Sequence, residues 1–190
     1  MERRNAEYQG ALKRLGERIA ASLIFDRYNV FSDREVRRMS DVVFSLSIVI
    51  TMLSTYFHRE SEVEPYLITF NDEFPKEKDI IVRLARVFQF LRLMRLPPTS
   101  RAWKKADLFV LICEIDRLLN LEKVVLDVND VAARLSLFYE RIGDALKQAS
   151  SDELLQRYFK TTLQATADRT NRVNRAEVIR KVILGEWAPK

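Results

Sequence analysis

The residues best suited to polar chemistry form a repeat in the last quarter of the sequence. Arginines at 169, 172 and 175 recur every third position, with Asn171 and Asn174 between them. Guanidinium groups pair with phosphate and carboxylate oxygens, and asparagine amides both donate and accept hydrogen bonds. The repeat therefore predicts contact with a phosphate backbone or with a carboxylate-bearing partner. The alternative is that these residues clamp the last helix onto carboxylates of the same protein.

A second basic group surrounds the turn at Pro97 and Pro98. Its cations are Arg83, Arg86, Arg92, Arg95, Arg101, Lys104 and Lys105. Trp103 lies among them and could offer a stacking plane to a base or a guanidinium. We take Arg92, Arg95, Arg101, Trp103 and Lys104 as a candidate basic ridge. The alternative is that these side chains cover the outer face of two amphipathic helices.

No catalytic or metal-binding pattern accompanies these basic groups. His58 is the only histidine, and nothing in the sequence places it beside Cys113 or a serine, as nucleophilic catalysis would require. The acidic residues between positions 60 and 73 coincide with expected helix starts, where the helix dipole favours negative charge. Four glycines cannot build a phosphate-binding loop. The sequence predicts no catalytic residue, no metal ion and no cofactor.

Composition sets the broad class. The chain has 190 residues, 47% of them hydrophobic, and a formal net charge of +5, which suits a polyanionic partner without requiring one. A single cysteine in an apolar run indicates a buried thiol in a reducing cytoplasm. The uncharged run from Val42 to Phe57 is short for a membrane span and rich in hydroxyl residues, so it predicts a buried helix. We expect a cytoplasmic protein without a signal peptide or membrane contact.

Helical periodicity and capping signals place these residues on helices. The expected spans are 2–22, 32–58, 65–70, 76–95, 100–119, 130–149, 151–164 and 170–185. Ser32 and Glu35 form a capping box, Asn129 and Ser151 are expected caps, and Gly185 is an expected stop. No segment alternates as a strand would. The prediction is an all-α, compact bundle of about eight helices, with one domain over 1–190.

Three sequence elements resemble a known family. Residues 2–10 fit the pattern E-x-R-N-A-E-(Y/F)-x-G, and Arg37-Arg38-Met39-Ser40-Asp41-Val42 resembles an R-R-M-x-D-V-E helix start, although Val43 replaces its acid. Residues 166–178 are similar to T-x-x-x-x-N-R-x-x-R-x-E-(I/V). These patterns, in this order, are those of the ParB/sulfiredoxin-like proteins related to GmrSD restriction endonucleases.

The resemblance implies the helical C-terminal region of that family. Its catalytic half carries an Asp-Gly-Gln-Gln-Arg type motif in an upstream α/β domain associated with nucleotide hydrolysis and DNA cleavage, and this sequence has no such motif. We therefore expect a truncated homologue, a split gene product or a fragment that serves phage defence and restriction. It would support an N-terminal nuclease/NTPase domain or partner chain, contact DNA, and have no activity of its own.

The candidate contact residues are Arg4 and Asn5 at one end of the chain and Arg169, Asn171, Arg172 and Arg175 at the other. The competing hypothesis is a stand-alone helical protein–protein interaction module without a nucleic-acid role. A third is an enzyme with an unfamiliar site, which hydrolysis of a nucleotide by the purified chain would reveal.

Overall fold

Helices account for the regular structure of this chain. A computed structural model describes residues 9–54, 56, 63–145, 152–163 and 168–188, and no strand occurs among them. Eight of the described helices have seven or more residues. The all-α prediction is confirmed. The chain divides into two compact units, Met1–Ala85 (unit 1) and Arg86–Lys190 (unit 2), and the single domain over 1–190 stays a prediction.

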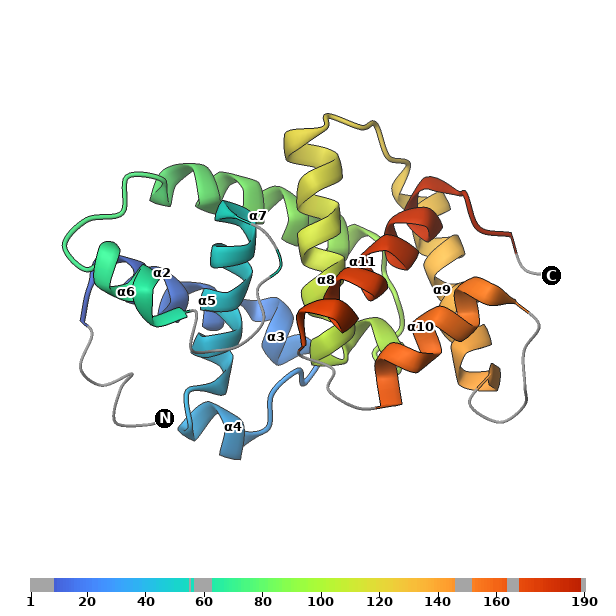
Figure 1. Cartoon of the computed structure of the whole chain (residues 1–190), viewed down its shortest axis with the longest axis horizontal. Coiled ribbons are helices and arrows are strands. Elements are labelled where there is room, and N and C mark those ends of the chain that lie inside the picture. Colours follow the sequence, from blue (N-terminus) through green and yellow to red (C-terminus); the bar gives the residue numbers. More distant parts are fainter. Residues whose placement is uncertain (1–8, 55, 57–62, 146–151, 164–167, 189–190) are drawn as a thin grey trace. The chain divides into compact units, whose positions relative to one another are not determined.

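Unit 1 is built around one apolar helix. Its elements are α2 (Ala11–Ala20), α3 (Leu23–Arg27), α4 (Asp33–Arg37), α5 (Ser40–Leu53), α6 (Val63–Thr69) and the first part of α7 (Glu77–Leu93) (Figure 1). Helix α5 packs against α2, α4 and α6. Its buried hydroxyl residues Ser45, Ser47 and Thr51 donate to carbonyl oxygens four residues earlier, at 2.8–2.9 Å. These hydroxyls are therefore satisfied within the helix, which lets neighbouring helices pack closely.

The predicted helix over 32–58 is wrong in one respect, because it is two helices in the described part of that range. Ser32 and Glu35 do form the expected capping box, in which the Ser32 backbone N–H donates to the Glu35 carboxylate at 3.0 Å. However, Met39 adopts a left-handed conformation, with a φ of 57°, between α4 and α5. A helix cannot continue through a left-handed residue, so α4 stops and α5 starts afresh.

Gly10 lies where two backbone segments approach closely. The N–H of Ala11 donates to the Asn71 carbonyl oxygen at 2.8 Å, and a Cβ on residue 10 would overlap the Asn71 backbone. We expect Gly10→Ala to lower the free energy of unfolding by about 1–3 kcal/mol, since backbone atoms cannot move aside as a side chain can. Urea denaturation would measure the change. Gly143→Ala is the control, because a Cβ there meets no atom within 4 Å; equal stability of the two variants would contradict the prediction.

The last helix of unit 2 packs against three other helices of the same unit. It contains the rest of α7, the short 3₁₀ helix η2 (Arg101–Trp103), α8 (Lys105–Asp116) with the π-helical turn η3 (Arg117–Leu121), α9 (Val128–Ala145), α10 (Glu153–Leu163) and α11 (Arg169–Leu184). Figure 1 shows α11, in red, lying against α8, α9 and α10. The apolar residues of α11 that face them are Val178, Ile179, Val182 and Ile183, all buried.

Aspartates, rather than the expected residues, cap two helices of unit 2. Asp127 Oδ1 accepts from the N–H groups of Asn129 and Asp130 at 2.8 and 3.0 Å, so the prediction of Asn129 as the cap of α9 is wrong by two positions. Asp152 Oδ1 accepts from two N–H groups at the start of α10. The predicted cap Ser151 lies outside the described residues. Gly185 ends α11 with a φ of 78°, as expected.

None of the helices that the structure describes combines the length and apolar character needed to cross a membrane.

Candidate nucleic-acid interface

The arginine repeat occupies the first half of α11, and its members have different environments. Arg169 is exposed at the first position of the helix, Arg172 is half-buried, and Arg175 is only 1% exposed. The Nε atom of Arg175 lies 3.3 Å from Asp107 Oδ1, and its Nη2 atom donates to the Thr161 carbonyl oxygen at 2.6 Å. Arg175 thus connects α11 to both α8 and α10. The guanidinium is enclosed by protein, which favours the intramolecular alternative over contact with a nucleic acid or partner for Arg175.

Asp107 is the centre of this buried network. Its carboxylate accepts the Tyr158 hydroxyl at 2.5 Å and lies 3.0 Å from Arg101 Nε. Burial raises the pKa of the Asp107 carboxyl, while the guanidinium groups of Arg101 and Arg175 and the Tyr158 hydroxyl oppose the rise. Two arginines and a hydroxyl donor surround the carboxyl group, and these partners offset part of the cost of burying it. The network joins η2, α8, α10 and α11.

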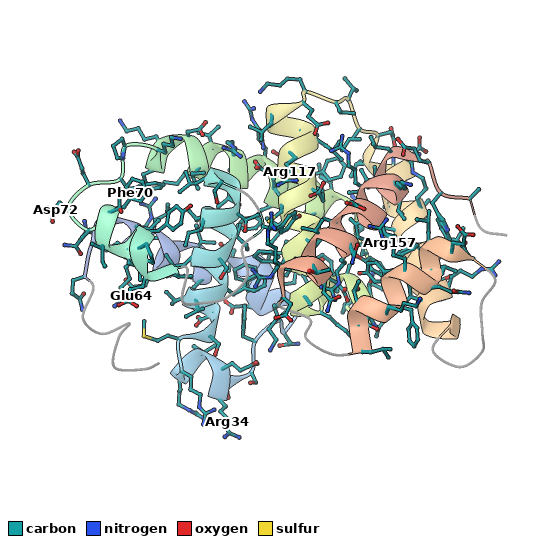
Figure 2. The ribbon with its side chains drawn as sticks, viewed as in Figure 1. Arg34, Glu64, Phe70, Asp72, Arg117 and Arg157 are labelled. Atoms are coloured by element: carbon teal, nitrogen blue, oxygen red, sulfur yellow. The ribbon has the colours of Figure 1, made fainter. Side chains whose placement is uncertain are left out.

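The other polar residues of the repeat also contact protein. Arg172 places its guanidinium carbon 4.4 Å from the centre of the Phe109 ring. Arg157 extends from α10 (Figure 2), where it donates to Asn174 Oδ1 at 2.7 Å and pairs with Glu177. Asn171 is half-buried. These contacts favour the intramolecular alternative for most of the repeat, with Arg169 as its exposed member.

The residues of the candidate basic ridge also differ in how far they are buried. Trp103 is 4% exposed and its indole N–H donates to the Pro97 carbonyl oxygen at 2.9 Å. This burial favours the alternative in which Trp103 packs within the protein rather than stacking on a base. Arg101 turns toward Asp107. Among the outer cations of the group, Arg83 pairs with Asp79 and Arg86 donates to Asn120.

Three ridge residues remain exposed: Arg92, Arg95 and Lys104. Their side chains form no hydrogen bond and no ion pair with a residue that the structure describes, although the charge of Lys104 lowers the pKa of the Asp107 carboxyl. Arg92 is in the last turn of α7, Arg95 follows it with a φ of 50°, and Lys104 immediately precedes α8. We call these three residues the exposed ridge cations. They are the cations of the candidate ridge that are available to a partner.

The positive charge of the chain belongs to unit 2. Residues 86–190 contain 19 lysines and arginines against 13 aspartates and glutamates, a formal charge of +6. Residues 1–85 contain 13 basic and 14 acidic residues, a formal charge of −1. The difference in formal charge between the two units is larger than the net charge of +5 for the whole chain. Unit 2 is therefore the part of the chain to which a polyanion would be attracted.

A pocket of about 350 Å³ opens beside the network. One wall is formed by the segment 97–104, including Arg101 and Lys104, and the other by α9, including Tyr139 and Glu140. Sequence reasoning missed this pocket and the network behind it. The available signal was Asp107, a charged residue directly before the apolar run 108–113 of α8, but its partners are distant in the sequence.

The remaining candidates are a buried cysteine and three residues that the structure does not describe. Arg4, Asn5 and His58 lie outside the described residues. Cys113 is buried, and burial raises the pKa of its thiol, so the thiol is protonated near neutral pH. Among the residues that the structure describes, no group of three or more His, Cys, Asp or Glu side chains is arranged to hold a metal ion.

The fold and the charge distribution together define an all-α protein whose second unit is basic. The chain matches no protein-family model, and it has no match among curated proteins or among solved structures.

Proposed function

We propose that this chain is the helical part of a GmrSD-like phage-defence protein, and that unit 2 contacts the DNA phosphate backbone. The observation that carries the DNA contact is the set of three exposed ridge cations on a unit with a formal charge of +6. Their side chains form no hydrogen bond or ion pair with the described residues. Lysine and arginine side chains of this kind supply sequence-independent affinity by displacing the counterions of DNA. The family assignment rests on the three sequence elements alone.

The proposed role is positioning rather than catalysis. The Asp107 network fixes η2 and the start of α8, and these elements hold the Lys104 backbone between them. The Trp103 side chain bonds to the Pro97 carbonyl and so fixes the segment between α7 and α8. Ridge cations on a rigid segment lose less conformational entropy on binding than cations on a loose one. A nuclease/NTPase domain or partner chain would supply the chemistry.

Duplex binding by the purified chain tests the DNA contact. A fluorescently labelled 20-base-pair duplex is titrated with the chain, and anisotropy is followed at several salt concentrations. We expect measurable binding at low salt and a linear fall of log affinity with log salt, because phosphate contacts release counterions. Absence of binding at low salt would remove the proposal and would leave the interaction-module hypothesis as its replacement.

A further inference from the structure

The pocket in unit 2 has two walls, and each of them contributes polar side chains to a lining that is otherwise apolar. Helix α9 contributes Ser136, Tyr139, Glu140 and Gly143. This spacing of three, four and seven residues places them on one face of the helix. The facing wall contributes the Thr99 and Ser100 hydroxyls and the cationic side chains of Arg101 and Lys104. The volume of about 350 Å³ is near the lower end of the range for small-molecule sites.

The charges around this pocket do not cancel. Behind the wall, one buried carboxylate, Asp107, is shared by the guanidinium groups of Arg101 and Arg175. Two cations on one anion leave a positive charge in excess. Lys104 adds a second positive charge and Glu140 subtracts one, so the set keeps a formal charge of +1. The Arg101 side chain is largely shielded from water, and the attraction of its charge for an anion is therefore stronger than it would be at an exposed position.

Hydrogen-bond donors are also in excess. Arg101 directs Nε toward Asp107, and its two terminal nitrogens make no hydrogen bond with any described residue. The Ser100 hydroxyl oxygen accepts from the Ala102 N–H at 3.2 Å, which leaves its own hydrogen to donate. The Lys104 ammonium group has three N–H donors, and none of them forms a hydrogen bond with a described residue. A ligand with several acceptor oxygens would satisfy these donors together.

We propose that this pocket binds a small phosphate monoester, with the phosphate between Arg101 and Lys104. A phosphate monoester carries a charge of about −1.5 to −2 at pH 7 and three terminal acceptor oxygens, whereas a carboxylate has one charge and two oxygens. The phosphate therefore matches two cations and neighbouring hydroxyls. Glu140, on the opposite wall, accepts a hydrogen bond from a hydroxyl group on the rest of the ligand.

Calorimetric titration of the full chain with glycerol 3-phosphate tests the proposal, with acetate and glycerol as comparison ligands at matched ionic strength. We expect a Kd below about 1 mM for glycerol 3-phosphate, and binding at least about tenfold weaker for acetate. Lys104→Gln should weaken glycerol 3-phosphate binding about tenfold, because one charged contact is lost. Equal affinity for acetate and glycerol 3-phosphate would overturn the proposal.

Gly143→Leu provides the matched steric test, since it fills the pocket without changing any charge. A Cβ at residue 143 meets no atom within 4 Å, and leucine favours a helix more than glycine does, so the variant should fold. It should lose glycerol 3-phosphate binding by at least about tenfold. Ser136→Leu, checked by circular dichroism, replaces it if Gly143→Leu fails to fold. Unchanged binding in a folded blocking variant would overturn the proposal.

The pocket and the proposed DNA contact share Lys104, and two other variants separate them. Gly143→Leu retains the exposed ridge cations, and duplex affinity should therefore be unchanged in it. Arg92→Gln removes a ridge cation that does not line the pocket, and it should leave glycerol 3-phosphate binding unchanged.

Discussion

Arg175→Met is expected to lower the free energy of unfolding by about 3–5 kcal/mol. Methionine retains much of the side-chain volume but removes the charge that Asp107 and the Thr161 carbonyl oxygen contact. Breaking a buried ion pair from one side is unfavourable because the remaining carboxylate stays desolvated with fewer partners. Arg101 and Tyr158 still contact Asp107, which places the expected loss within this range rather than beyond it.

Chemical denaturation followed by circular dichroism measures the loss. Arg169→Met is the control, because it makes the same replacement at an exposed position of the same helix. We expect Arg169→Met to change the free energy of unfolding by less than about 1 kcal/mol, as is usual at exposed positions. A similar small effect of Arg175→Met would mean that the buried network does not stabilise unit 2.

Removing the exposed ridge cations is expected to weaken duplex DNA binding by about two orders of magnitude at low salt. The triple variant is Arg92→Gln, Arg95→Gln, Lys104→Gln. Glutamine keeps the side chains polar and comparable in length, and no described residue loses an ion pair, so the fold should be retained. The loss comes from counterions that are no longer released when the complex forms.

A second triple variant separates a ridge effect from a general effect of charge. Arg34, Arg37 and Arg38 are exposed on or beside α4 in unit 1, and Arg34 extends outward there (Figure 2). Their replacement by glutamine removes as many positive charges from the chain as the ridge variant does. We expect this variant to bind duplex DNA within about threefold of the original chain. Equal losses in both variants would show that total charge, and not the ridge, controls binding.

Much of the helical framework follows from local signals in the sequence. The Ser32–Glu35 capping box, the proline break before η2 and the Gly185 stop are all properties of short segments. The break at Met39 has no such signal, because methionine rarely adopts a positive φ. Hydrophobic periodicity continues through this position in the sequence, so it does not indicate the break.

The arginine repeat shows why a candidate site is harder to predict than a helix. A spacing of three residues turns about 60° short of a full circle at each step, so three arginines spread over about 120° of the helix. One of them can therefore be exposed while another is buried. Which one is buried depends on Asp107 and Thr161, and those partners come from other helices. The spacing therefore predicts that the three arginines lie on one helix, but it does not predict which of their side chains is buried.

The salt dependence of duplex binding tests the central claim, namely that the exposed ridge cations of unit 2 contact phosphates. Log affinity is plotted against log salt for the original chain and for the Arg92→Gln, Arg95→Gln, Lys104→Gln variant. Each lost phosphate contact should reduce the magnitude of the slope by about 0.9, so the expected reduction for three contacts is about 2.7. Parallel lines for the two proteins would contradict the claim.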